Sequence, residues 1–409
     1  MSELTEQVEP SPPPAPAANS PCATAPDGVV TIERPMFPDN ENSQTFGYSF
    51  KVFPGTDPNA PTVIYLPGGP GQAGIGTSRE GAVPPGEYTL IETDPRGVGC
   101  NAAETPDHYP DAFYNTVYIA DDVLAIVETL RLDSYVLYGI SYGTALATVV
   151  ASRAQQRGLS APRALVLEGV LGRAFAAAEP EQGFFEQWMA IYIHLPVDIQ
   201  KQFQVTPLPF GFSALEWGSI LENALPSAAV PATGEQYSQL EVVLRAGLAA
   251  DADQATRDAV ESGLAELAHN PTDDFVERIH HAIACHELTE TDPTAMVLGP
   301  DGLVVVSQDC QDVLLDRPYA ASDWPVSAPI YYYTGTNDPN TPPWQADVHF
   351  SVETSAARSL VHVTRAGHNA LRSNLTDCMP TLWAAMVSDG DFEAALATCT
   401  WPTELLRSL

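Results

Sequence analysis

Five consecutive residues near the middle of the chain have the types and spacing that expose a serine nucleophile. Gly139, Ile140, Ser141, Tyr142 and Gly143 match the pattern G-x-S-x-G, with an apolar run before them and a helical pattern after them. A serine on such a tight turn points its hydroxyl away from the sheet, and small neighbours avoid a clash across the turn. The pattern predicts Ser141 as a nucleophile, although five residues alone also fit an ordinary glycine-rich turn.

A serine needs a general base to become nucleophilic, and the base needs a partner that orients it. After a motif of this kind, an acid and then a histidine should follow along the chain. Asp338 comes just after the apolar run APIYYYTG, and His368 comes just after RSLVHVT. Taken singly, Asp338 fits a turn in Asn-Asp-Pro, and His368 fits a surface position beside Gly367. Together, their order and positions predict a Ser141–Asp338–His368 triad.

A glycine-rich segment upstream has the composition of an oxyanion loop. Acyl transfer builds negative charge on a carbonyl oxygen, and backbone N–H groups held in place stabilise that charge. The segment LPGGPGQAG, residues 66–74, follows an apolar run, and its glycines let the backbone approach a ligand closely. We predict that the N–H groups of Gly69 and Tyr142 form the oxyanion hole. A plain glycine-rich turn is the simpler alternative.

The other histidines considered lack such a context. His362 lies inside an apolar run and fits a packed side chain. His280, His281 and His286 lie near Glu287, but no H-E-x-x-H spacing is present, and the packing of an amphipathic helix explains them better. No two cysteines have the C-x-x-C spacing typical of a structural zinc site. We therefore predict no metal and no cofactor.

The elements that must position these residues alternate between apolar runs and helical patterns. Two runs near the start, GVVTIERPMF and FGYSFKVF, predict paired antiparallel strands. Later strands alternate with helices, which indicates an α/β fold with a mostly parallel sheet flanked by helices. We expect these later strands at residues 61–69, 88–97, 134–139, 163–170, 328–335 and 358–364, and helices at 121–132 and directly after the serine motif.

The alternation stops between about residues 174 and 325, where the sequence is mainly helical. This pattern predicts a helical cap, residues 174–325, inserted between two parts of an α/β core, residues 22–173 and 326–409. The second part should end in a helical extension. Residues 1–21 are rich in proline and polar side chains, which predicts a disordered spacer.

The chain has 409 residues and a net charge of −34, from 52 acidic and 18 basic residues. Such a surface repels phosphate backbones, so we predict no nucleic-acid partner. Salt adaptation, attraction of cationic substrates and a simply well-solvated surface all fit this charge. No apolar run approaches the roughly 18 residues that cross a bilayer, so we predict no membrane span. The expected partner is a small molecule or a short peptide; the oligomeric state stays open, and a monomer is compatible with the sequence.

Six cysteines are spread along the chain, which suits disulfides formed in an oxidising compartment. Six cysteines can pair in many ways, and six buried free thiols are a further alternative. The chain opens without a basic start or an apolar stretch, so no signal peptide is visible. We interpret it as an exported protein, periplasmic or extracellular, whose leader has been removed. Short loops favour Cys285 with Cys310 and Cys378 with Cys399, which leaves Cys22 with Cys100.

Further motifs accompany the serine turn: GGPG at residues 68–71, DPRGVG at residues 94–99, LEGVLG, AIACHE and the segments around Asp338 and His368. Together these motifs resemble the prolyl aminopeptidase and tripeptidyl aminopeptidase family of α/β-hydrolases, most strongly its secreted tripeptidyl aminopeptidase branch. The resemblance runs from about residue 22 to the end, and the serine motif and GGPG are its most specific parts. It implies the α/β-hydrolase fold with a helical cap, the same triad, and peptides with a free amino terminus as substrates. Asp94 and Arg96 resemble structural loop residues of that family.

In that family, carboxylates of the cap hold the ammonium group of the substrate, and the resemblance implies Glu287 for this role. Glu181 and Glu186, in EQGFFEQW, are further candidates without a motif behind them. The chain departs from the prolyl branch at Pro67, where a histidine is common, and at Asn369, where a small residue is more usual. Both departures leave the substrate preference open.

Three hypotheses for the function follow from these residues. The favoured one is a serine exopeptidase that releases residues or short peptides from free amino termini through an acyl-enzyme intermediate. The second is a carboxylesterase that uses the same triad on small esters. The third is a binding protein that kept the fold without the chemistry, which the complete set of serine, acid, histidine and glycine loop disfavours.

Overall fold

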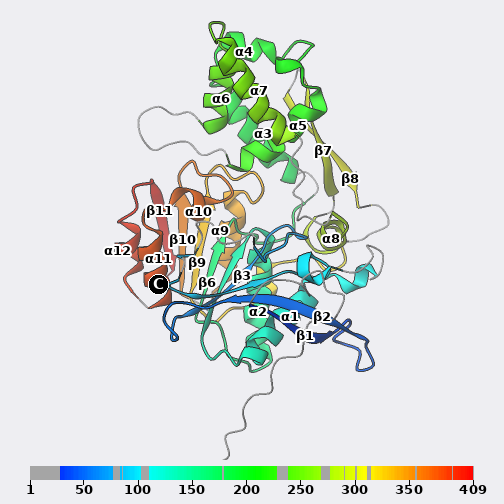
Figure 1. Cartoon of the computed structure of the whole chain (residues 1–409), viewed down its shortest axis with the longest axis vertical. Helices are drawn as coiled ribbons and strands as arrows, with labels where there is room; N and C mark the ends of the chain where they lie inside the picture. The colour runs from blue at the N-terminus through cyan, green and yellow to red at the C-terminus, as the bar shows by residue number, and fades with distance from the viewer. Residues whose placement is uncertain are drawn as a thin grey trace, which may run out of the picture.

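The computed structural model describes most of the chain, and Figure 1 shows its arrangement. The predicted spacer and Cys22 lie outside the described residues. The described residues are 28–76, 83–84, 86–102, 110–176, 179–227, 238–268, 277–289, 291–299, 302–310, 315–354, 357–388 and 390–408.

One large sheet forms the body of the protein, with described strands in the order β1-β2-β4-β3-β5-β6-β9-β10-β11 (Figure 1). The strands from β4 to β10 in this order run parallel. Strands β2 and β11 pair antiparallel with the two ends of that block, and β1 pairs antiparallel with β2. The predicted mostly parallel sheet is therefore confirmed. The strands are β1 (Val29–Pro35), β2 (Thr45–Phe53), β3 (Thr62–Leu66), β4 (Thr89–Thr93), β5 (Tyr135–Ile140), β6 (Ala164–Glu168), β9 (Ile330–Gly335), β10 (Arg358–Val363) and β11 (Thr403–Ser408).

Helices cover both faces of the sheet, as the alternation in the sequence predicts. Successive strand residues point to opposite faces, so Leu137 packs with the side chains of α1 and α2 while Val136 packs with those of the last helices. All six residues of β5 are buried, which explains its continuous apolar run. The first group of helices is α1 (Thr116–Leu130), α2 (Tyr142–Gln156) and α9 (Pro343–Val352), and the second is α10 (Ala370–Asn374), α11 (Met379–Val387) and α12 (Phe392–Leu396).

The segment between β6 and β9 forms a separate group of helices beyond the sheet, with a β-hairpin beside it (Figure 1). The helices have their own apolar core, built around Trp188, Phe203 and Trp217. The helices are α3 (Glu179–Tyr192), α4 (Val197–Gln202), α5 (Ala214–Ala224), α6 (Gln239–Leu248) and α7 (Gln254–Ala268), and the hairpin strands are β7 (Thr291–Gly299) and β8 (Gly302–Asp309). The same segment also contains α8 (Glu277–Ile283) and the π-helical turn Ala284–Leu288, whose buried apolar side chains pack with the core of the sheet instead. We call this segment the cap.

Three strands depart from the sequence-based expectations. The hairpin β7–β8 lies where we expect a mainly helical segment from the sequence, although the sequence Gly-Pro-Asp-Gly at residues 299–302, which includes the last residue of β7 and the first of β8, is typical of a turn. The end of the chain, expected to be helical, instead forms β11, which pairs antiparallel with β10. From Thr403 to Leu406 the side chains of this edge strand alternate between partly buried and exposed. So short an alternation is a weak signal in the sequence.

Two of the three predicted disulfides are formed in the described residues. Cys285 and Cys310 join the π-helical turn to the end of the hairpin in the cap, with Cα atoms 5.5 Å apart. Cys378 and Cys399 join the beginning of α11 to the segment after α12 in the core, with Cα atoms 4.9 Å apart. The third predicted pair, Cys22 with Cys100, stays a prediction because Cys22 is not described.

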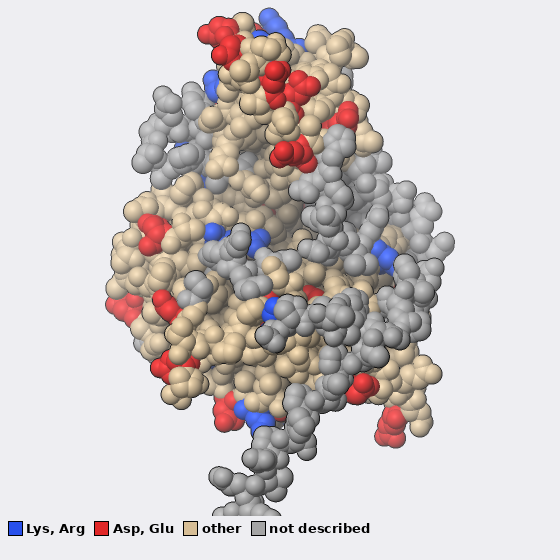
Figure 2. Space-filling view, viewed as in Figure 1, with Lys and Arg blue, Asp and Glu red and all other residues tan. Residues whose placement is uncertain are grey.

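The acidic side chains are spread over the cap and the rim of the core on the face shown in Figure 2, without gathering into one patch. Within the described part of the chain, no helix is long and apolar enough to cross a membrane.

Candidate active site

Ser141 lies between β5 and α2, with backbone angles φ 54° and ψ −125°. This positive φ is costly for a residue other than glycine and persists only where the surrounding structure fixes it. The Ser141 N–H donates to the Glu168 carbonyl oxygen at 2.9 Å, and the Ser141 carbonyl oxygen accepts from the Thr144 N–H at 2.9 Å. The side chain is half-buried. The turn therefore holds a serine in the strained conformation that the G-x-S-x-G pattern predicts.

The two glycines of this turn are required by close backbone contacts. A Cβ atom at Gly139 would lie 2.2 Å from the Gly143 carbonyl oxygen, and one at Gly143 would lie 2.1 Å from the Leu66 carbonyl oxygen. Distances this short exclude any side chain. The beginning of α2 therefore packs against the end of β3, where the glycine loop starts.

That glycine loop lies against the serine. A Cβ atom at Gly68 would lie 3.0 Å from the Ser141 Cβ, and Gly69 has a φ of 103°, which favours glycine. Asp94 fixes the far end of the loop because its carboxylate accepts the N–H groups of Gly74 at 2.7 Å and Ile75 at 2.8 Å. Burial raises the pKa of Asp94, and these backbone donors oppose the rise. Asp94 thus has a structural role in this loop.

Asp338 and His368 are brought together at the carboxyl ends of the neighbouring strands β9 and β10. The His368 Nδ1 lies 2.8 Å from the Asp338 Oδ2, and both side chains are largely buried. The Thr341 hydroxyl also donates to Asp338 Oδ2 at 2.7 Å, and the Asn340 N–H donates to Oδ1 at 2.9 Å. A carboxylate that accepts from Nδ1 leaves the other ring nitrogen of His368 free to accept a proton.

The cap touches this pair of residues at two backbone contacts that the sequence analysis did not predict. The His368 N–H donates to the Pro226 carbonyl oxygen at 2.8 Å, directly after α5. Gly367 allows this approach, since a Cβ atom there would lie 2.1 Å from the same oxygen. On α3, a Cβ atom at Gly183 would lie 2.6 Å from the Pro339 carbonyl oxygen, next to Asp338. Gly367 and Gly183 are the residue types in the sequence that these two close contacts require.

Glu287, the predicted ligand of a substrate ammonium group, is buried in the π-helical turn near the beginning of α1. Its carboxylate accepts from the Thr116 hydroxyl and from the Thr116 N–H at 3.2 Å, and Arg317 lies 3.6 Å away. Burial raises the pKa of Glu287. The Thr116 hydroxyl also lies 2.9 Å from the Tyr142 hydroxyl. Glu287 is therefore linked through one threonine to the ring of the residue that follows Ser141.

The two other predicted acids lie on α3. Glu186 is exposed, and its carboxylate accepts from the Gln182 side chain at 2.6 Å. Glu181 belongs to the same helix, but its side chain is not among the described ones.

The other histidines that the sequence analysis considers lie outside the pair of Asp338 and His368, and three of them contact polar groups of their own. His286 lies 2.9 Å from Asp316, and His362 lies 3.0 Å from Asp347. The His280 ring lies 3.2 Å from the Pro70 carbonyl oxygen of the glycine loop, whereas His281 is exposed. Among the described residues, no group of three histidine, cysteine or acidic side chains could hold a metal ion.

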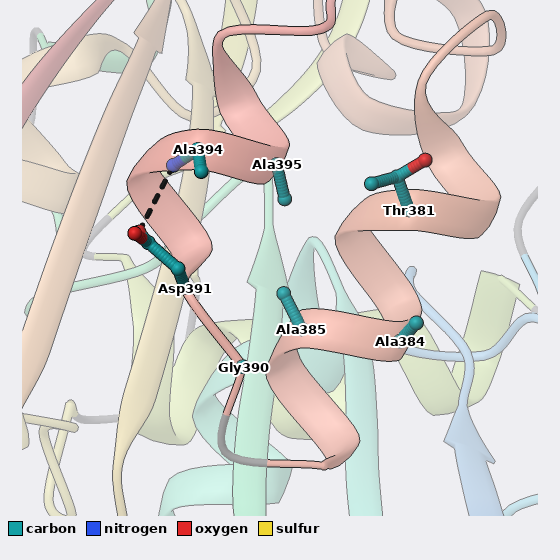
Figure 3. A pocket seen from close by; sticks show the side chains of 7 residues that line it. All are labelled: Thr381, Ala384, Ala385, Gly390, Asp391, Ala394 and Ala395. Carbon is teal, nitrogen blue, oxygen red and sulfur yellow. Dashed lines mark hydrogen bonds between the residues drawn. The ribbon is translucent and has the colours of Figure 1, made fainter.

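Two of the cavities among the described residues are lined by residues other than the triad. One, of about 440 Å³, lies between α5, α6 and α7, and uncharged side chains line it, including Ser227, Leu240, Val260 and Leu264. The other, of about 370 Å³, lies between α11 and α12 and is lined mostly by small side chains (Figure 3). Because Ser227 directly follows Pro226, the cap cavity begins one residue from the contact with His368.

Comparisons with known proteins agree with the observed architecture. Residues 61–161 match the family model described as alpha/beta hydrolase fold. No curated protein sequence matches the chain.

Solved structures that resemble the chain include the esterase RhEst1 from Rhodococcus sp. ECU1013, at 14% identity over 84% of this chain and 96% of that one, with a TM-score of 0.44. A 2-hydroxy-6-oxo-6-phenylhexa-2,4-dienoate hydrolase from Rhodococcus sp. strain RHA1 matches at 16% identity over 88% and 98%, with a TM-score of 0.46. At such identities and scores these structures say nothing about the substrate. The strand order and the family match together identify the chain as a protein with the α/β-hydrolase fold.

Proposed function

We propose that the protein is a serine hydrolase that works through an acyl-enzyme, with Ser141, Asp338 and His368 as its triad. The observation that carries this proposal is the placement of all three residues at the carboxyl ends of parallel strands. Ser141 stands on a strained turn after β5, and the 2.8 Å contact between Asp338 and His368 joins the ends of β9 and β10. Ligands of open parallel sheets bind at this edge.

In the proposed reaction, His368 takes the proton of the Ser141 hydroxyl as the serine oxygen attacks the carbonyl carbon of the substrate. The N–H groups of Gly69 and Tyr142 stabilise the oxyanion that forms. His368 then gives its proton to the leaving amine or alcohol as the bond to the carbonyl carbon breaks. Water, deprotonated by His368, then attacks the acyl carbon. The bond from this carbon to the Ser141 oxygen breaks, His368 returns the proton to that oxygen, and the acid is released. Asp338 holds the imidazole ring in the orientation that these steps need.

For the substrate, we propose peptides with a free amino terminus, cleaved near that end. The family resemblance of the motifs supports this proposal, and so does the position of Glu287. Its buried carboxylate contacts Thr116, whose hydroxyl lies 2.9 Å from the hydroxyl of Tyr142, the residue that follows Ser141. Glu287 is the acid that we propose for the ammonium group of the substrate. Export to an oxidising compartment, supported by the two disulfides, would place the enzyme among such peptides.

A carboxylesterase is the second candidate, and one observation favours it. The side chains that line the cap cavity near His368 are uncharged, and most are apolar. An acyl chain would suit this lining, whereas an ammonium group would find no countercharge there.

Hydrolysis rates on three substrate types would test the proposal and separate the candidates. The substrates are aminoacyl and short peptidyl nitroanilides with a free amine, the same compounds with the amine acetylated, and short-chain nitrophenyl esters. We expect turnover of the free-amine anilides, a large loss on acetylation, and no turnover by Ser141→Ala. Turnover of esters alone, unaffected by an amine, would exclude the exopeptidase. Full activity in Ser141→Ala would exclude the serine hydrolase itself.

A comparison of two glutamate variants would locate the ammonium site. If Glu287 holds the amine, Glu287→Gln should raise KM for free-amine substrates and leave KM for acetylated ones unchanged. Glu186→Gln tests the other described candidate acid, on the exposed face of α3, and should change neither KM if Glu287 alone holds the amine.

A further inference from the structure

Glu168, the last residue of β6, contacts the segments that carry both the serine and the histidine of the triad. Strand β6 lies between β5, which leads to Ser141, and β9, which leads to Asp338. The Glu168 carbonyl oxygen accepts the Ser141 N–H at 2.9 Å. The backbone of Glu168 therefore helps to fix the strained turn of the nucleophile.

The Glu168 side chain extends to the segment that follows the histidine. It is fully buried, and its Oε1 accepts the N–H groups of Leu371 at 2.8 Å and Arg372 at 3.0 Å. These two residues belong to α10, which begins two residues after His368. The other oxygen accepts from the hydroxyl of Tyr138 on β5. One carboxylate thus ties the strand of the nucleophile to the helix that follows the histidine.

The next residue, Gly169, completes this arrangement on the imidazole itself. It has a φ of 62°, and a Cβ atom there would lie 2.8 Å from the Cε1 and 2.9 Å from the Nδ1 of His368. The Gly169 N–H donates to the Tyr333 carbonyl oxygen on β9 at 3.0 Å, which fixes the backbone where it faces the ring. The end of β6 therefore lies against the Cε1 and Nδ1 atoms of His368 and also contacts the segment that follows this histidine.

We propose that Glu168 is a positioning residue of this active site. Its carboxylate fixes the segment after His368 relative to β5, so that the imidazole stays aligned with Ser141. Glu168 contacts no reacting atom, so its effect passes through Ser141 and His368. This inference rests on the proposed triad. A misalignment of about 1 Å between nucleophile and base lowers the rate of the chemical step by about a hundredfold, and it should leave substrate binding nearly unchanged.

The length of the side chain, rather than its charge, should matter for a positioning role. Glu168→Gln keeps an oxygen that can accept both N–H groups, whereas Glu168→Asp keeps the charge but is one methylene too short to reach them. We expect Glu168→Gln to keep kcat within about fivefold of the wild type and Glu168→Asp to lose about tenfold or more. Glu168→Ala should lose about a hundredfold, and KM should change little in any variant. The rate of labelling by a fluorophosphonate should follow kcat.

Glu353 provides a matched control for the general cost of altering a buried carboxylate. It is buried and accepts a backbone N–H from Val326 at 3.1 Å, but this contact lies before the amino end of β9, at the opposite edge of the sheet. Glu353→Ala should lower the melting temperature without lowering kcat of the folded enzyme. An equal loss of kcat in Glu353→Ala would show that the effect of Glu168 is general destabilisation, which overturns the proposal.

Other outcomes also decide the question. Wild-type kcat in Glu168→Asp together with an inactive but folded Glu168→Gln would show that the charge matters and the positioning does not. Wild-type kcat in folded Glu168→Ala, with Ser141→Ala inactive, would refute the role of Glu168 and leave the serine hydrolase intact. Hydrolysis that persists in Ser141→Ala would instead refute the serine hydrolase. If Glu168→Ala does not fold, the Asp and Gln variants carry the test.

Discussion

The carboxyl edge of the sheet and the cap hold their side chains in different ways. At the sheet edge, Ser141 is fixed by hydrogen bonds of its backbone, and Asp338 by hydrogen bonds to its carboxylate. The cap has its own apolar core around Trp217 and reaches these residues at backbone contacts such as that of Pro226. From this difference we propose that the core holds the reacting groups in place and that the cap contributes to the choice of substrate. Changes at the sheet edge should therefore lower kcat, and changes in the cap should alter KM.

The largest effect should come from the acid at the sheet edge. Asp338→Asn keeps the size of the side chain but favours the wrong tautomer of His368, because an amide can donate to the ring nitrogen. We expect kcat to fall by about 10³- to 10⁴-fold with little change in KM, measured by steady-state kinetics on the preferred substrate. A loss below about tenfold would show that Asp338 does not orient the base.

A contact between the two regions should show an intermediate effect. Gly367→Ala places a Cβ atom within 2.1 Å of the Pro226 carbonyl oxygen, so either the cap turn or the His368 loop must move. We expect kcat/KM to fall by about tenfold or more, because His368 would shift or lose its backbone partner. Gly299→Ala on β7 is the control, since its Cβ would meet only the Gly302 carbonyl oxygen at an ordinary 3.7 Å, and it should be neutral. Equal activity of both variants would show that the cap contact is dispensable.

The disulfides allow a comparison of the two regions in stability. Each bond closes a loop of similar length, with sequence separations of 25 in the cap and 21 in the core. Replacing both cysteines of a pair with serine should lower the free energy of unfolding by about 3 kcal/mol in each case. We expect the cap variant, without Cys285–Cys310, to raise KM as well, and the core variant, without Cys378–Cys399, to leave KM unchanged. Thermal unfolding and kinetics on both variants would check this, and identical KM values would contradict the division of roles.

The smallest effect concerns a buried carboxyl away from both regions. Burial raises the pKa of Glu353 to about 7, whereas the unfolded chain has a value near its ordinary one. Between these two pKa values the folded protein holds a proton on Glu353 that the unfolded chain has lost. This protonation stabilises the folded state fully at lower pH, and the stabilisation is lost as the pH rises through about 7. Glu353→Gln should raise the melting temperature relative to the wild type at pH 8 more than at pH 5. A difference that does not depend on pH would contradict the raised pKa.

Much of the core follows from the sequence because each part has a local signal. The strand β5, the serine turn and α2 follow one another directly in the chain. The local residue pattern is therefore enough to predict the strained turn at Ser141. Asp338 and His368 were predicted from their positions after apolar runs, because the carboxyl ends of parallel strands meet at one edge. Two disulfides were also predicted from short loops.

The features that the sequence does not predict depend on contacts between residues far apart in the chain. The carbonyl oxygen of Pro226 reaches His368 across more than a hundred residues, and a backbone acceptor leaves no trace in the residue type. In the sequence, Glu168 is an acid at the end of a strand with no special signal. Its contact with the N–H of Leu371 becomes visible only in the folded structure. The burial of Glu287 against Thr116 likewise depends on how the cap meets α1.

The central claim is that Ser141 is a nucleophile activated by His368. The most direct test is to treat the folded protein with a fluorophosphonate and to locate the adduct by peptide mass spectrometry. We predict one adduct, on Ser141, with no labelling of Ser141→Ala and labelling slowed by several orders of magnitude in His368→Ala. A folded wild-type protein that stays unlabelled, or an adduct on another residue that persists in Ser141→Ala, would contradict the account.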